Sequence, residues 1–142
     1  MADISRNKAR TMINKTLAYA RENEFKPMAV IVLDAGGNPL AFDREDDSAP
    51  GRFAIAQAKA YGAVMMGMGG YALRKRAEEQ AYFVDSLNGV YGGKVVPVPG
   101  GVLIRNKKGV VIGALGVTGD TSEHDADAAL AGIEAAGLTG EA

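Results

Sequence analysis

The sequence contains no cysteine, no tryptophan and a single histidine, His124, among its 142 residues. Without cysteine the chain can form no disulfide and has no thiolate nucleophile or thiolate metal ligand, which fits a reducing compartment. One histidine also excludes bis-histidine haem ligation. No HExxH pattern and no serine in a glycine elbow are present. Zinc sites, hydrolase triads and cysteine-ligated haem are therefore unsupported.

An excess of one charge is also missing, because sixteen Lys and Arg residues balance seventeen Asp and Glu residues. The net charge of −1 gives no overall field that would draw the chain to nucleic acid or to anionic lipid. No apolar stretch follows the charged start MADISRNKAR, so we expect neither a signal peptide nor a spanning helix. We therefore expect a cytoplasmic protein with neither nucleic acid nor membrane as a partner.

What the sequence does contain is the composition of an ordinary globular domain. Hydrophobic residues make up 47% of the chain and charged residues 23%, unlike the depleted, highly charged usage of disordered segments. A chain of this length buries roughly 70% of its unfolded surface around one core. No repeat, linker or low-complexity tract divides it. We predict one domain over residues 1–142.

Hydrophobic spacing predicts the elements of the first half of the chain. Apolar residues at helical intervals predict a helix over residues 5–22. Two short β-branched or alternating runs, 28–34 and 39–45, surround the turn AGGN and predict a hairpin. The alanine-rich residues 52–66 predict a second helix. The glycine-rich MMGMGG ends that helix, and a third is expected from Tyr71.

The second half predicts a loop, another hairpin and a final helix. Segment 88–93 is glycine-rich, and VVPVPGGVLIR and GVVIGALGVTG flank the turn NKKG. Ser122 and Asp125 match a capping box for a last helix that ends at Gly137. The predicted order is α-ββ-αα-ββ-α. We predict an α/β protein of the α+β kind, with an antiparallel sheet of about four to five strands flanked by helices.

Two long stretches resemble the GlcG/HbpS family, which is also found as the C-terminal domain of PduO-type proteins. One is VPGGVLIRNKKGVVIGALGVTGDTSEHDADAALAGIEAAGL; the other comprises VIVLDAGGNPLAFDREDD and IAQAKAYGA. Together the resemblance covers residues 5–138. It implies a profilin-like or PAS-like sheet, usually in a homo-oligomer, and some members bind haem or a corrinoid. Because a shared fold does not carry a shared reaction, the site has to be argued from residues.

His124 is the first candidate for an axial ligand if a tetrapyrrole binds, because haem iron commonly takes an imidazole. Methionine, tyrosine, threonine or water are the other axial choices. The alternative is that His124, in the first turn of the last predicted helix between Glu123 and Asp125, is simply solvated.

A methionine cluster is the second candidate. Met65, Met66 and Met68 lie near Tyr71 and could cushion a flat apolar ligand or supply a thioether. Packing in the core or between subunits is the alternative.

The glycines of the second predicted hairpin form the third candidate. Pro99, Gly100 and Gly101 allow backbone amides to approach a ligand closely, and we predict that they line a cleft. A tight turn would also explain them. The later glycines follow GxxGxxG rather than GxGxxG spacing outside any βαβ unit, which argues against NAD.

Four charged residues, Arg44, Asp46, Lys59 and Arg105, are expected to converge near this turn. Arg or Lys there could bind a carboxylate or a haem propionate. Solvated surface charge is the alternative, although Lys59 lies on an otherwise small and apolar helical face.

Three functions follow, in order of preference. The first is a protein that binds a small molecule or a tetrapyrrole such as haem. The second is an enzyme for an organic acid or carbonyl compound, in which Arg44, Lys59 or Arg105 holds a carboxylate and His124 or Asp125 moves a proton. The third is an oligomeric interaction module without a ligand.

Overall fold

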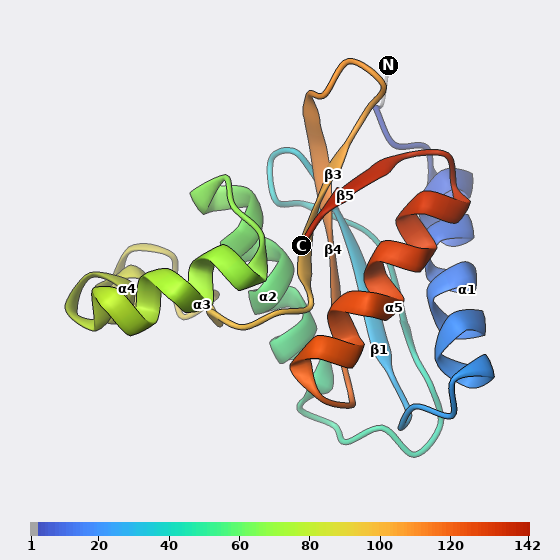
Figure 1. The fold of residues 1–142 in the computed structure, drawn as a ribbon, viewed down its shortest axis with the longest axis horizontal. Coiled ribbons are helices and arrows are strands. Elements are labelled where there is room, and N and C mark those ends of the chain that lie inside the picture. The colour runs from blue at the N-terminus through green and yellow to red at the C-terminus, as the bar shows by residue number, and fades with distance from the viewer. Residues whose placement is uncertain (1–2) are drawn as a thin grey trace.

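The computed structural model describes residues 3–142, and its centre is one five-stranded sheet (Figure 1). Neighbouring strands are antiparallel, in the order β2-β1-β4-β3-β5. The strands are β1 (Ala29–Asp34), β2 (Pro39–Arg44), β3 (Gly101–Arg105), β4 (Val111–Thr118) and β5 (Thr139–Glu141). Met1 and Ala2 of the predicted domain lie outside the described residues.

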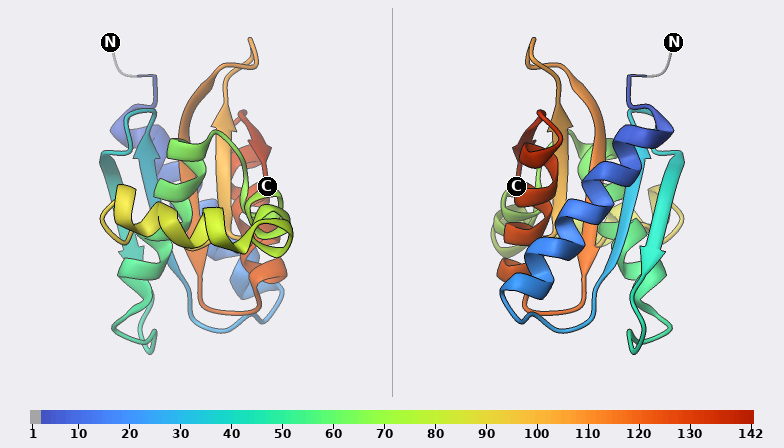
Figure 2. Two further views of the ribbon diagram at one scale, coloured as in Figure 1. Left: turned by 90° about the vertical axis from the view of Figure 1, so that its left-hand side faces the viewer. Right: turned by 90° about the vertical axis from the view of Figure 1, so that its right-hand side faces the viewer.

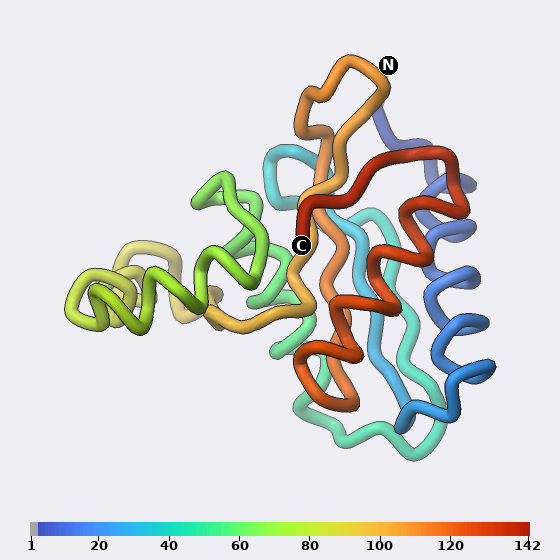
Figure 3. The backbone as a smooth tube through the Cα atoms, in the orientation of Figure 1, coloured from blue at the N-terminus to red at the C-terminus, as the bar shows by residue number. Residues whose placement is uncertain are grey.

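Residues 3–142 form five helices, which fall into three groups. They are α1 (Arg6–Glu22), α2 (Arg52–Met66), α3 (Gly70–Glu79), α4 (Ala81–Val90) and α5 (Ser122–Ala135). Helices α1 and α5 pack together on one face of the sheet, and α2 lies on the other (Figure 2). Helices α3 and α4 extend sideways as an arm, which the backbone tube shows most clearly (Figure 3). No helix among residues 3–142 has the length and apolarity needed to cross a membrane.

Side-chain size sets how closely the helices approach. Ser5 caps α1 by accepting a hydrogen bond from the Lys8 amide, and the helix buries Met12 and Ile13 against α5. Gly132 of α5 lies directly against Thr16 of α1, where a Cβ would overlap the threonine hydroxyl. On the opposite face, α2 presents a row of buried alanines to the central strands. Small residues therefore let both helical layers pack closely on the sheet.

The predicted antiparallel sheet and the order α-ββ-αα-ββ-α are confirmed, and the structure adds two elements. Helix α4 and the short edge strand β5 were not predicted. Half of the predicted loop 88–93 is wrong, because Asn88 and Gly89 form the last turn of α4. That helix is held by Val84 and Leu87, which pack on Val95, and this tertiary contact outweighs the low helix propensity of glycine.

Candidate functional site

Three connections meet at one end of the sheet, where β1 begins and β2 and β4 end. Ala29 pairs with Arg44 on one side and with Thr118 on the other. Residues 23–28, 45–51 and 119–121 therefore come together; we call this end the site edge, and it lies at the bottom of Figure 1. The amide of Lys26 donates to Asp120, and the hydroxyl of Ser48 donates to the Met28 carbonyl.

Helix α5 starts at the site edge and places His124 in its first turn. Its N-cap is Thr121, whose hydroxyl accepts a hydrogen bond from the His124 amide at 3.1 Å. The predicted capping box with Ser122 at its start is therefore wrong. The carboxylate of Asp125 does not close such a box, because it points inward and is buried.

Asp120 holds the imidazole of His124 in one orientation. Its Oδ1 lies 2.8 Å from Nδ1 of His124, and its two oxygens also accept the amides of Lys26 and Thr121, each at 2.7 Å. These hydrogen bonds, the Lys26 amide first, lower the pKa of Asp120 to about 2. The carboxylate is thus ionised and can only accept, so Nδ1 carries the proton and Nε2 of the neutral ring keeps its lone pair.

Phe25 fixes the plane of the same ring. The two rings stack with centroids 4.2 Å apart and an angle of 8° between their planes. The side chain of His124 is 46% exposed, and Nε2 makes no hydrogen bond to any residue between 3 and 142. A histidine whose Nδ1 is held by a carboxylate and whose Nε2 is open has the arrangement that metal-binding histidines adopt.

Behind this surface lies a buried ion pair between α2 and α5. The side chains of Lys59 and Asp125 are only 3% and 1% exposed. The Lys59 ammonium donates to Oδ2 of Asp125 at 2.9 Å and to the Val117 carbonyl at 3.0 Å. Burial lowers the pKa of Lys59 and raises that of Asp125, and the charge of each partner opposes the shift. Neither group reaches solvent, so a catalytic role for Lys59 and Asp125 stays a prediction that requires the pair to open.

The turn formed by Pro99, Gly100 and Gly101 packs on Lys59. Gly100 has a φ of +116°, and a Cβ there would lie 2.9 Å from the Lys59 ammonium nitrogen. A Cβ on Gly101 would overlap the Lys59 carbonyl. These glycines therefore make room for Lys59. The cleft predicted beside them, and a role of the three residues in ligand binding, stay predictions.

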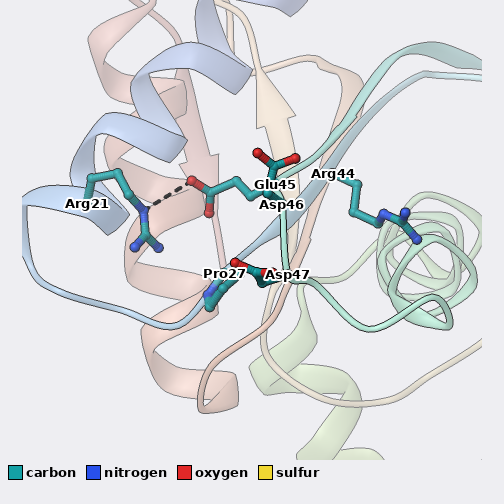
Figure 4. A pocket seen from close by; sticks show the side chains of 6 residues that line it. All are labelled: Arg21, Pro27, Arg44, Glu45, Asp46 and Asp47. Carbon is teal, nitrogen blue, oxygen red and sulfur yellow. Dashed lines mark ion pairs between the residues drawn. The ribbon is translucent and has the colours of Figure 1, made fainter.

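A polar hollow of about 480 Å³ opens at the site edge beside the segment 45–47 (Figure 4). Nε of Arg21 bridges to Oε2 of Glu45 at 3.1 Å, whereas Arg44 points away from them. The lining holds three carboxylates and two guanidinium groups, which disfavours an anionic ligand inside it. Its lining consists of Arg21, Pro27, Arg44, Glu45, Asp46 and Asp47.

The structure does not bring the four expected charges together. Arg44 and Asp46 lie at the hollow, and Lys59 is buried behind the turn. Arg105 lies at the opposite end of β3 from that turn, where it bonds to Glu141 at 2.9 Å and to the Gly109 carbonyl at 2.7 Å. Of these four residues, Lys59 is the one that packs against Gly100 and Gly101.

The methionine cluster also lies outside the site edge. Met65 packs on the tip of the first hairpin, where a Cβ on Gly37 would be 3.0 Å from its methyl group. Met66 packs against the small core that joins α4 to Val95. These are packing contacts. No group of three or more His, Cys, Asp or Glu side chains among the described residues could hold a metal ion by itself.

Asp120 and Phe25 were not predicted as site residues from the sequence. Asp120 had a readable signal, since it precedes His124 by four residues. Phe25 had none, because its stacking depends on how the connection between α1 and β1 folds over the first turn of α5.

Comparisons with known proteins agree over nearly the whole chain. The family model described as haem degrading protein HbpS-like matches residues 4–134. The crystal structure of a PduOC:heme complex is similar with a TM-score of 0.84 and 27% identity, covering 97% of both chains. No curated protein is similar enough to count as a match.

Two further solved structures share the fold. The protein ORFY of Klebsiella pneumoniae has a TM-score of 0.84 and 24% identity, covering 96% of this chain and 92% of that one. A double mutant of HbpS from Streptomyces reticuli has a TM-score of 0.81 and 23% identity, covering 94% and 87%.

Proposed function

This chain belongs to the HbpS-like family, and on that premise we propose that it binds haem or a related tetrapyrrole, with Nε2 of His124 as an axial ligand to the iron. The observation that carries the proposal is the Asp120–His124 hydrogen bond at 2.8 Å, which leaves Nε2 as the open nitrogen. A carboxylate on the other ring nitrogen also makes the imidazole a stronger donor to a metal.

The donor set fits a haem better than a bare metal ion. A haem already supplies four nitrogens to its iron and needs one protein ligand, whereas a structural zinc site needs about four. His124 is the only histidine in the chain and cysteine is absent, so one imidazole is what the protein can offer. When bound, haem would supply an iron centre capable of one-electron and oxygen chemistry.

Arg44 is a better candidate than Arg105 for a propionate contact outside the hollow, because its side chain points away from the carboxylates that line the hollow. Arg44 lies at the same end of the sheet as the start of α5, and it makes no ion pair with another residue in the described part of the chain. Arg105 is already paired with Glu141 at the far end. The solved complex of PduOC with heme supports the ligand class for a relative of 27% identity.

Titration with haemin tests the proposal directly. We expect wild-type protein to shift the Soret band of haemin saturably, and His124→Ala to weaken binding by at least about tenfold, because loss of one metal ligand or its support typically has such an effect. Val110→Ala is the matched control, since Val110 is an exposed side chain on the β3–β4 turn at the other end of the sheet.

Two results would remove the proposal. One is a wild-type spectrum that equals that of free haemin at every ratio. The other is a His124→Ala variant that binds as tightly as wild type and shows the same band position.

We also propose that the protein is a cytoplasmic homo-oligomer. The arm formed by α3 and α4 supports a second copy as its partner, because Tyr82 is 76% exposed and Val90 69% exposed on it. Apolar side chains exposed in this way on a projecting element are typical of contacts between subunits. The absence of cysteine supports the compartment.

A further inference from the structure

We infer that the buried Lys59–Asp125 pair positions the imidazole of His124, an inference that rests on the proposed role of His124 as the axial ligand. The pair does not touch the imidazole of His124. It acts through the turn that carries Asp120, and both residues are therefore positioning residues.

The first step of this chain of contacts is the buried carboxylate of Asp125. Oδ2 of Asp125 accepts from the Lys59 ammonium at 2.9 Å, and Oδ1 accepts from the backbone amide of Asp120 at 3.0 Å. One buried carboxylate therefore joins helix α2 to the turn that precedes α5.

The second step is the turn itself. Gly119 has a φ of +155° and lies against the Pro27 carbonyl, so the backbone enters Asp120 through a position with no room for a side chain. Asp125 holds the amide of Asp120 from inside, and the Lys26 amide holds its side chain at 2.7 Å from the neighbouring connection. Between these two anchors, Oδ1 of Asp120 is set 2.8 Å from Nδ1 of His124.

Lys59 is needed because Asp125 is buried. An ionised carboxylate with 1% exposure is costly without a cation, and breaking such a pair leaves the other charge unpaired. Arg52, the other cation near the pair, donates to the Thr118 hydroxyl at 2.8 Å and forms no ion pair with Asp125. Lys59 is thus the residue that keeps Asp125 in place.

An ion pair with a purely structural role would stabilise the fold without affecting the tautomer of the His124 imidazole. Two double variants separate the possibilities, because both remove the buried charges and only one of them offers an acceptor to the Asp120 amide. Lys59→Met with Asp125→Asn keeps an oxygen there, and Lys59→Met with Asp125→Leu has a side chain of similar size without one. Replacing a buried pair by neutral residues of similar volume is commonly tolerated.

The readout is the tautomer of His124, measured by nitrogen NMR on protein labelled with 15N-histidine. As the only histidine, His124 gives a single pair of ring nitrogens. We expect wild type and the Asn double variant to show the proton on Nδ1 only. In the Leu double variant, and in Lys59→Met alone, the two nitrogen shifts should move together as both tautomers become populated.

The inference is overturned if the Asn and Leu double variants give the same pair of shifts, or if a folded Lys59→Met variant keeps the wild-type shifts. If Lys59→Met alone does not fold, the two double variants decide. All of these spectra are recorded without haem. The inference can therefore fail while haemin still binds to His124, and haemin binding can fail while the tautomer still depends on Asp125.

Discussion

At the scale of single residues, the carboxylate of Asp120 joins three parts of the site edge. It accepts from the Lys26 amide of one connection, from the Thr121 amide of its own turn and from the imidazole of His124. Its side chain is only 12% exposed, so these hydrogen bonds are partly shielded from water. Asp120 therefore contributes both to the stability of the site edge and to the orientation of the proposed ligand.

The pH dependence of the free energy of unfolding should show the contribution of Asp120. The pKa of Asp120 falls from 3.8 to about 2 on folding, so its stabilisation is fully present above 3.8 and is lost as the pH falls through about 2. We expect Asp120→Asn to lower the free energy of unfolding by about 1–2 kcal/mol near neutral pH, allowing for solvent screening. In urea unfolding, the difference from wild type should shrink steadily between about pH 4 and pH 2.

Asp127→Asn is a suitable control, because Asp127 is exposed on the same helix. Its difference from wild type should stay small at every pH. A difference for Asp120→Asn that is constant across the acid range would mean that the carboxylate charge does not stabilise the fold.

At this scale the sequence identifies a residue whose type is chemically distinctive. It does not identify a residue whose role depends on tertiary packing. His124 could be chosen because it is the only imidazole, and Lys59 because it is a lysine among alanines. Asp125, the partner of Lys59, was expected to take part in a helix cap. The sequence could not show that Lys59 and Asp125, 66 residues apart, form a buried ion pair. The stacking of Phe25 on His124 is missed for the same reason.

At the scale of elements, the close contact between α2 and β4 depends on small residues. A Cβ on Gly116 would overlap the Ala56 carbonyl and lie 2.9 Å from the Cβ of Ala60. Because the carbonyl belongs to the helix backbone, it cannot turn aside as a flexible side chain would.

We therefore expect Gly116→Ala to destabilise the protein by about 1–3 kcal/mol, with the helix pushed away from the sheet. Gly89→Ala is the matched control, since Gly89 lies in α4 with nothing within 4 Å of an added Cβ. That control should be neutral or stabilising by up to about 1 kcal/mol, because alanine favours a helix. Thermal unfolding of both variants would contradict this account if Gly116→Ala melted at the wild-type temperature.

The misses at this scale have identifiable causes. The sequence around Asn88 and Gly89 predicts a loop. Helix α4 forms there because Val84 and Leu87 pack against Val95. Strand β5 has only three residues and no alternation to detect; it forms because it pairs with β3, Leu103 opposite Glu141 and Arg105 opposite Thr139. Periodicity reports long elements that bury one face, and it misses short ones that depend on distant partners.

At the scale of the whole molecule, the antiparallel topology decides which residues meet. The sheet order places the end of β4, the start of β1 and the end of β2 at the same end of the sheet. His124, Phe25 and Arg44 therefore lie at that end. It sends Arg105 to the opposite end, beside β5. The family resemblance predicted the topology, but the charges could be assigned to ends only once the register was known.

The most direct measurement is native mass spectrometry of the protein purified from its own host and, separately, after incubation with equimolar haemin. We predict a homo-oligomer that carries one haem per chain, with the haem lost in His124→Ala while the number of subunits is unchanged. A wild-type spectrum without haem after incubation, or equal haem loading of wild type and His124→Ala, would contradict the central claim that His124 holds the ligand.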